Sequence, residues 1–156
     1  MINTKNIDIF REFESSTESV ALIHQCNCFN TMVGGIAWVI SKKYPSASEV
    51  DNKTVSGDIK KLGSFTYSKI KDNMYILNLY GQYDCGYGDR RTNYEAVYCG
   101  LESILQFINK NNIKKVLIPY KMSSNLAGGS WNIIYSMIVE IFEKTDIVVT
   151  ICKIED

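Results

Sequence analysis

The sequence lacks a net charge. Seventeen lysine and arginine residues balance seventeen aspartate and glutamate residues in a chain of 156. A protein that binds nucleic acid in general usually carries a basic surplus, which attracts the phosphate backbone. Basic pairs such as Arg90 and Arg91 are therefore expected to be solvated surface. The balance argues against general nucleic-acid binding.

Metal-ligand patterns are also missing. The chain contains one histidine, His24, and no pair of cysteines in the C-x-x-C spacing of zinc sites. The five cysteines are an odd number, which argues against a complete disulfide framework. Free thiols are typical of a reducing compartment. We therefore expect no metal, no other cofactor and a cytoplasmic location.

Long apolar runs are absent as well. The first ten residues, MINTKNIDIF, contain no apolar signal core. No apolar run approaches the length of about 20 residues that crosses a membrane. Hydrophobic residues make up 46% of the chain and no linker or repeat interrupts it, a composition typical of globular proteins. We expect one domain, residues 1–156, that is monomeric and does not contact a membrane.

Hydrophobic patterning predicts strands that alternate with helices. Apolar or β-branched runs predict strands at residues 20–23, 64–67, 74–80, 116–119 and 146–152. Periodicity predicts helices from Gly35 to the residue before Pro45, over residues 46–61 and 94–111, and after LAGGSW, where apolar residues from Ile133 to Phe142 face inward. This alternation is typical of a three-layer α/β/α sandwich with a mixed, mostly parallel central sheet.

Three loops that leave strands are rich in glycine or polar residues: the first loop (residues 27–35), the middle loop (81–93) and the second loop (123–129). Ligands of such sheets bind beyond the carboxyl ends of the strands, so we expect the site there. The first and second loops run into helices, with Gly34 and Gly35 in VGGIAW and Gly128 and Gly129 in LAGGSW.

The paired glycines favour anion binding. Glycine lets backbone N–H groups approach an anion, and a helix N-terminus adds unpaired donors and a partial positive charge. Two such loops could hold a diphosphate from both sides without a lysine. The residues alone leave open that the glycines serve only tight turns and close packing of helix on strand.

Four motifs resemble those of the macrodomain family, which binds ADP-ribose. IDIF resembles the family's G-D-I/L-F start, and ALIHQCN resembles the strand that ends in an asparagine. MVGGIA is similar to the first phosphate loop G-G-G-I-A, and IPYKMSSNLAGGSW is similar to the second. Their order and spacing agree with the family over nearly the whole chain, so a macrodomain-like fold is expected.

The resemblance implies ADP-ribose, or a close derivative, as the ligand. Asp8, next to Ile9, would receive the adenine amino group, although it could simply cap a helix. Asn27 would hold the distal ribose, although it could simply cap a turn. The two loops would hold the diphosphate through the following residues: Val33, Gly34, Gly35, Ile36, Ala37, Ser123, Ser124, Asn125, Leu126, Ala127 and Gly128.

The position of His24 and the tryptophan of LAGGSW resemble one branch of the family. That branch contains ADP-ribose-1''-phosphate phosphatases and terminal ADP-ribose glutamate hydrolases, and the stand-alone form resembles bacteriophage domains. The resemblance implies a phosphatase in which His24 orients water or protonates the leaving oxygen, with Asn27 in the catalytic set. His24 could instead be a core histidine bonded to its neighbours.

The sequence also departs from this branch. Ala127 stands where the glutamate hydrolases have an aspartate, and the middle loop contains no lysine. Ser123 stands where the family has a glycine-rich loop start, so the backbone there should be less permissive. The alternatives are a non-catalytic protein that binds ADP-ribose or NAD-derived signal nucleotides, and a hydrolase of ADP-ribosyl esters.

Residues around the middle loop are further candidates. Either Asp84 or Asp89 could activate water, or both could be solvated. One tyrosine could stack on the ligand, although aromatic residues at strand ends more often pack. The four tyrosines concerned are Tyr80, Tyr83, Tyr87 and Tyr94.

Overall fold

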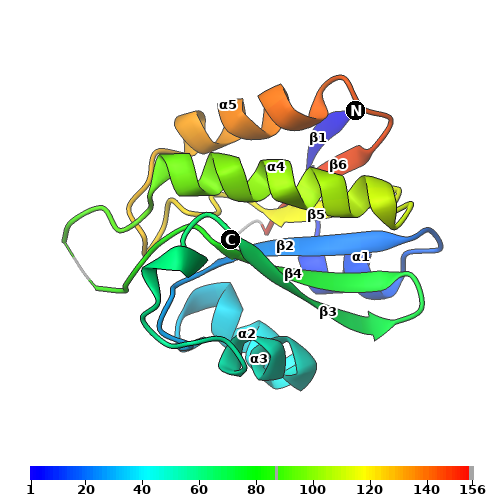
Figure 1. The fold of residues 1–156 in the computed structure, drawn as a ribbon. Coiled ribbons are helices and arrows are strands. Elements are labelled where there is room, and N and C mark those ends of the chain that lie inside the picture. Colours follow the sequence, from blue (N-terminus) through cyan, green and yellow to red (C-terminus); the bar gives the residue numbers. More distant parts are fainter. Residues whose placement is uncertain (87, 155–156) are drawn as a thin grey trace.

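A six-stranded sheet runs through the middle of the computed structural model, which describes residues 1–86 and 88–154 (Figure 1). The strand order is β1-β6-β5-β2-β4-β3, and every neighbouring pair is parallel except β4 and β3. The strands are β1 (Ile2–Asn6), β2 (Val20–Cys26), β3 (Phe65–Lys71), β4 (Met74–Tyr80), β5 (Lys115–Pro119) and β6 (Val148–Lys153).

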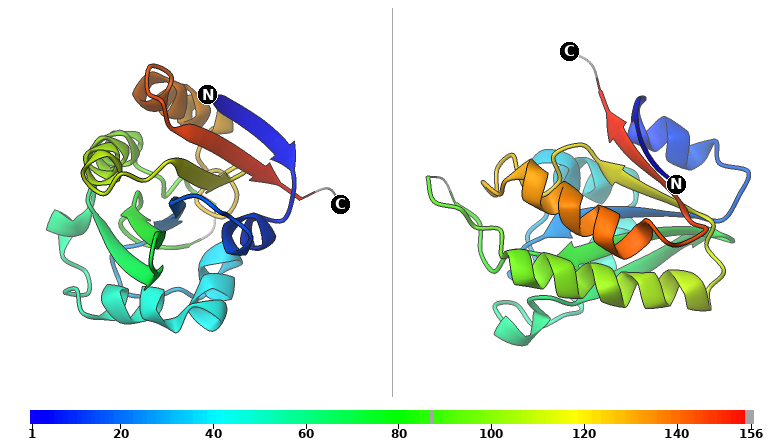
Figure 2. Two further views of the ribbon diagram at one scale, coloured as in Figure 1. Left: turned by 90° about the vertical axis from the view of Figure 1, so that its right-hand side faces the viewer. Right: turned by 90° about the horizontal axis from the view of Figure 1, so that it is seen from above.

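Helices cover both faces of this sheet (Figures 1 and 2). One face packs against α4 (Tyr94–Lys110) and α5 (Trp131–Phe142). The other packs against α1 (Ile9–Glu14), α2 (Gly35–Lys43) and α3 (Pro45–Asn52). The predicted three-layer α/β/α sandwich with a mixed, mostly parallel sheet is confirmed.

The central strand β2 explains why its sequence is almost continuously apolar. Ala21 and Ile23 belong to the core under α4 and α5, whereas Val20 and Leu22 belong to the core under α1, α2 and α3. A strand with helices on both faces has no polar side, so the usual alternation disappears. His24 lies further along the same strand and is fully buried although it is polar.

The structure differs from the predicted elements in several places, among them the helix α1 and the longer strands β2 and β3, which were not predicted as such. The helix predicted over residues 46–61 ends at Asn52, and a short 3₁₀ helix, η1 (Ile59–Lys61), follows it. Gly57 between them has φ +79°, which a helix cannot contain. The strand β1 was not predicted, because its burial comes from pairing with β6 and only its first two residues are even partly buried.

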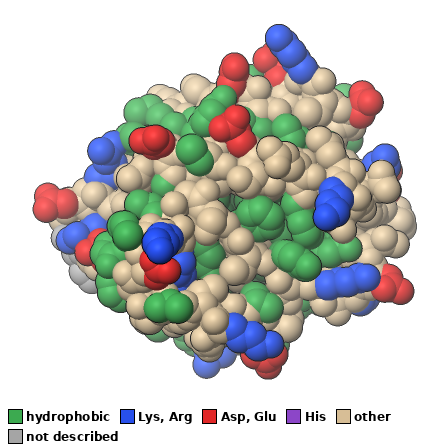
Figure 3. Space-filling model, viewed as in Figure 1, with side chains coloured by type: hydrophobic (Ala, Val, Ile, Leu, Met, Phe, Trp, Pro, Cys, Tyr) green, Lys and Arg blue, Asp and Glu red, His purple; other side chains and the backbone are tan. Residues whose placement is uncertain are grey.

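The visible surface carries both charge signs. Figure 3 shows lysine and arginine side chains interspersed with aspartate and glutamate over the face seen in Figure 1. Within the described part of the chain, no helix combines the length and apolar composition needed to cross a membrane.

Candidate functional site

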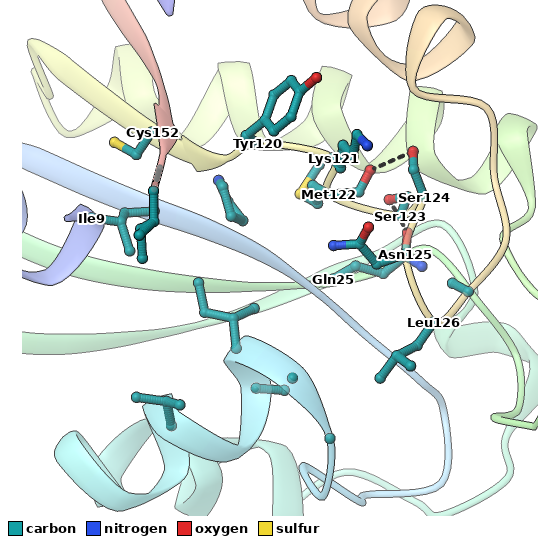
Figure 4. A pocket seen from close by; sticks show the side chains of 18 of the residues that line it. Ile9, Gln25, Tyr120, Lys121, Met122, Ser123, Ser124, Asn125, Leu126 and Cys152 are labelled. Atoms are coloured by element: carbon teal, nitrogen blue, oxygen red, sulfur yellow. Dashed lines mark hydrogen bonds between the residues drawn. The ribbon is translucent and has the colours of Figure 1, made fainter. Parts of the chain in front are cut away.

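A cleft lies at the carboxyl ends of β2, β5 and β6, where the N-terminus of α2 faces the segment after β5 (Figure 4). It consists of a main cavity of about 480 Å³ and an adjoining distal cavity of about 240 Å³. Both are bordered by the same five residues: Gln25, Gly34, Ala37, Gln82 and Leu126. The cavities are therefore parts of one site, at the edge that the sequence predicted.

One end of the main cavity is apolar. It is lined by Ile9 of α1, Val39 of α2, Cys152 of β6 and Ile154, which follows β6. A flat, largely apolar group such as a nucleobase suits this end. We call it the base end.

Asp8 lies next to this end but does not line the main cavity. Its Oδ1 accepts hydrogen bonds from the backbone N–H groups of Phe10 (2.8 Å) and Arg11 (3.1 Å), which makes it the N-cap of α1. The capping alternative is therefore observed, and adenine recognition by Asp8 stays a prediction.

The first loop presents a helix N-terminus to the cleft. Gly34 is the N-cap of α2, and Gly35 has φ +55°, a left-handed conformation that favours glycine. Gly35, Ile36 and Ala37 line the main cavity, and N–H groups in a first helical turn have no partner within the helix. The first turn of α2 contains no acidic side chain that would occupy these donors.

The second loop offers backbone donors without a helix. The N–H groups of Asn125, Leu126 and Ala127, which all line the main cavity, donate to no protein acceptor among the described residues. The chain reverses hand repeatedly here, with positive φ at Lys121 (61°), Ser123 (68°) and Gly128 (73°). Such alternation turns successive N–H groups toward one side and is typical of anion-binding backbone. Gly128 itself packs on the backbone of Arg90 and lines neither cavity.

Ser123 takes the left-handed conformation that glycine would take more easily. Its hydroxyl donates to Oε1 of Gln25, so this hydroxyl is already bonded. Its carbonyl accepts from the N–H of Gly129 (2.9 Å) and from Oγ1 of Thr92 (2.7 Å). These bonds hold the strained residue in place. The neighbouring serine, Ser124, was also predicted as a site residue and also lines the main cavity.

Gln25 was missed as a site residue. It lies on the floor shared by both cavities, and its Nε2 donates to Oε1 of Gln82 (2.9 Å) and Oγ1 of Thr92 (3.1 Å). A Cβ at Gly81 would come within 2.3 Å of its Oε1, so only glycine leaves room for this amide. The sequence did contain a signal for Gln25, because it is a polar residue near the end of a predicted buried strand, on the face opposite His24.

The distal cavity is bordered by amide, hydroxyl and thiol groups from Asn27, Thr31 and Cys85, and by the exposed Val33. Asn27 bonds within its own turn: Nδ2 donates to the carbonyl and hydroxyl of Thr31, and Oδ1 accepts from the N–H of Phe29. Asn27 is thus near the expected ribose position and also caps the turn. The residues that border the two cavities, within the described chain, include no carboxylate and no imidazole.

His24 is fully buried and lines neither cavity. Its Nε2 lies 2.7 Å from Oδ1 of Asn78, and the amide of Asn78 also donates to the carbonyl of Ala47. Burial lowers the pKa of His24 to about 4, although the bond to Asn78 opposes this shift. The imidazole is therefore neutral near pH 7, and the structure separates it from the cleft.

The middle-loop side chains mostly have structural partners. Asp84 pairs with Arg91 at 3.4 Å, and the hydroxyl of Tyr83 donates to the carbonyl of Gly57. The hydroxyl of Tyr94 accepts from the N–H of Ser130, at the start of α5. Tyr87 lies outside the described residues. No group of three His, Cys, Asp or Glu side chains in the described chain could hold a metal ion.

Comparison with solved structures gives the class of fold. The chain superposes on the macrodomain of Mycobacterium tuberculosis DarG with a TM-score of 0.77 and 18% identity, covering 100% of this chain and 99% of that one. Thermosipho africanus DarTG, solved in complex with ADP-ribose, gives a TM-score of 0.68 at 18% identity, over 87% of this chain and 38% of that one. A Bacteroides thetaiotaomicron protein of unknown function gives 0.85 at 21% identity, over 99% and 98% of the two chains. This protein has the macrodomain fold.

Sequence comparison gives the family. No protein-family model matches the chain. It is 30% identical over 136 residues to the uncharacterized 17.5 kDa protein of the tk-vs intergenic region of Enterobacteria phage T4, covering 85% of this chain and 86% of that protein. The chain belongs to the same family as this phage protein.

Proposed function

We propose that this protein binds ADP-ribose or a close derivative in the cleft. The observation that carries the proposal is the order of chemistry along the cleft: an apolar base end, two facing sets of unpaired backbone donors, and a distal cavity with amide and hydroxyl groups. A nucleobase, a diphosphate and a distal ribose occur in that order in ADP-ribose. A similar fold has been solved with ADP-ribose, which supports the proposal.

Calorimetric titration tests the binding. ADP-ribose is expected to bind with a micromolar dissociation constant, ADP more weakly because it leaves the distal cavity empty, and ribose 5-phosphate more weakly still. Binding that is equal for ADP and ADP-ribose would contradict use of the distal cavity. No binding of either nucleotide would contradict the proposal.

At a finer level, we propose hydrolysis of ADP-ribose 1''-phosphate to ADP-ribose and phosphate. The distal cavity equals roughly eight water volumes at about 30 Å³ each, which suits a ribose with a small substituent. Since no carboxylate or imidazole of the described residues borders it, the protein's contribution would be positioning and charge stabilisation by backbone and amide donors. His24 is not part of this mechanism, because it is fully buried and borders neither cavity.

Phosphate release from ADP-ribose 1''-phosphate, measured at matched saturation of wild type and of Gly35→Asp, tests the activity. Release by wild type alone supports the phosphatase. Tight binding without release would favour the non-catalytic alternative, and release of ADP-ribose from an ester substrate would favour the esterase. We also propose a cytoplasmic location, which the five free cysteines support.

A further inference from the structure

A buried lysine lies behind the first loop. Lys61, the last residue of η1, is only 7% exposed and lines neither cavity. A buried ammonium group is costly unless it is paired or hydrogen-bonded, so its partners indicate what it does.

Its partners belong to the turn of residues 27–31, here called the distal turn because Asn27 and Thr31 border the distal cavity. Nζ of Lys61 donates to the carbonyl of Cys28 (3.0 Å) and to Oδ1 of Asn30 (2.5 Å). Both bonds cross 31 or more positions of the chain. The distal turn is therefore fixed from behind by a charge that does not reach the ligand side.

The turn needs such a support because its conformation is unusual. Asn30 has φ +57°, and its amide also donates to the carbonyl of Thr54 (2.7 Å) while its Oδ1 accepts from the Thr54 hydroxyl (3.1 Å). The carbonyl of Cys28 accepts a second bond, from the N–H of Gly57 (2.7 Å). Residues 54–61 thus hold the middle of the turn, leaving Asn27 and Thr31 at its two ends.

Lys61 is itself held by buried groups of the sheet and of α3. Its Nζ lies 5.0 Å from the ring centre of Tyr80, whose hydroxyl donates to Oδ1 of the buried Asp51 (2.7 Å). Burial raises the pKa of Asp51, and the charge of Lys61 opposes that rise. The ammonium group therefore links α3 and β4 electrostatically to the distal turn.

We propose that Lys61 is a positioning residue for the distal part of the ligand, acting through the distal turn without touching the ligand. This inference rests on the proposed binding of ADP-ribose. It names a specific consequence: Lys61 supports contacts to the distal ribose and is not needed for those to the adenosine diphosphate part, which occupies the main cavity.

The test compares two ligands on three proteins. In Lys61→Met, which keeps the length of the side chain and removes its charge, the dissociation constant for ADP-ribose is expected to rise about tenfold, and that for ADP less than twofold. Lys60→Met removes a charge from the exposed neighbour and is expected to change neither constant. Lys61→Arg, which keeps the charge, is expected to recover part of the ADP-ribose affinity.

Asn30→Gly provides a second route if Lys61→Met does not fold, because glycine keeps the positive φ while removing the acceptor of the lysine. The same selective loss of ADP-ribose affinity is expected. Equal losses for ADP and ADP-ribose, or no loss for either, would overturn the inference while leaving the proposed function standing. Failure of the wild type to bind ADP-ribose would overturn both.

Discussion

The first and second loops present similar donors to the cleft but are built differently. The first loop ends in the N-terminus of α2, and side chains hold its turn, with Lys61 and Asn30 at the centre. The second loop has no helix at its donors, and backbone N–H groups bond to its carbonyls at Ser123 and Ala127, with side-chain bonds from Thr92 and to Gln25. A side-chain change should therefore act locally on the first loop, whereas an added atom that crowds the backbone should disturb the whole second loop.

A negative charge at the N-terminus of α2 should give the largest effect. In Gly35→Asp the carboxylate would lie where the diphosphate is expected, and aspartate tolerates the positive φ of this position. We expect affinity for both ADP and ADP-ribose to fall about a thousandfold, or about 4 kcal/mol. Calorimetry or fluorescence titration measures this loss.

Gly88→Asp is the matched control for that substitution. Gly88 also has positive φ, and nothing lies within 4 Å of an added Cβ. It is expected to keep wild-type affinity. A loss of similar size in both variants would point to general damage and would remove the special role of the α2 N-terminus.

Acid should destabilise the fold through the buried His24. Because burial lowers the pKa of His24 to about 4, the unfolded chain binds a proton below about pH 6.5 while the folded chain does not. The free energy of unfolding should therefore fall by about 3 kcal/mol between pH 6.5 and pH 4 from this residue.

Urea unfolding across this pH range measures the effect. His24→Gln can keep a donor to Asn78 and cannot be protonated, so its stability is expected to fall less steeply with acid. Parallel pH profiles for the two proteins would mean that His24 is protonated equally in the folded and unfolded states.

Extra volume at Gly129 should disturb the second loop as a unit. A Cβ there would lie 2.5 Å from the carbonyl oxygen of Ser123 and 3.2 Å from Cγ2 of Thr92. We expect Gly129→Ala to lower the free energy of unfolding by about 2 kcal/mol. Affinity for ADP and ADP-ribose should fall about equally, roughly tenfold.

The same added methyl group in the first loop should matter much less. At Gly34 the added methyl group would meet only the end of the Leu126 side chain, at 3.3 Å. The backbone of Gly34 is extended, a conformation that alanine adopts without strain. Gly34→Ala is expected to change affinity less than threefold. If Gly34→Ala is the more damaging variant, the contrast between the loops is reversed.

The smallest expected effect is the difference in stability between two substitutions of Ser123, which separates backbone strain from the loss of a hydrogen bond. Ser123→Ala and Ser123→Gly both remove the hydroxyl bond to Gln25, but only glycine relieves the left-handed conformation. Ser123→Gly should therefore be about 1 kcal/mol more stable than Ser123→Ala. Urea midpoints at equal slope give this difference, and equal midpoints would show that φ +68° costs nothing here.

The sequence predicts best where local pattern and tertiary environment agree. The bounds of β4 were predicted correctly, and α4 within one residue, because apolar runs and a one-sided stripe mark them. The strand β1 was missed because only its distant partner β6 makes it a strand.

The loops that line the cleft could be predicted from the sequence, but the buried residues behind them could not. Glycine pairs led to the prediction of two loops at the cleft, and most of the predicted loop residues do border it, although Gly128 and Gly129 do not. The burial of His24 depends on helices packed over both faces of the sheet, which no local pattern reveals. Lys61 is 31 positions from Asn30 and reads as surface charge, so only the fold brings it to the distal turn.

The pairing of β1 with β6 has a kinetic consequence. The backbone N–H of Val149 bonds to the carbonyl of Met1, and β1 lies in register along β6, so the first and last strands of the sequence pair with each other. Long-range contacts must offset the entropy of loop closure, so we expect this pairing to form late in folding. The base end, which combines Ile9 with Cys152, should therefore be the last part of the cleft to assemble. Nucleotide binding would then report the final step of folding.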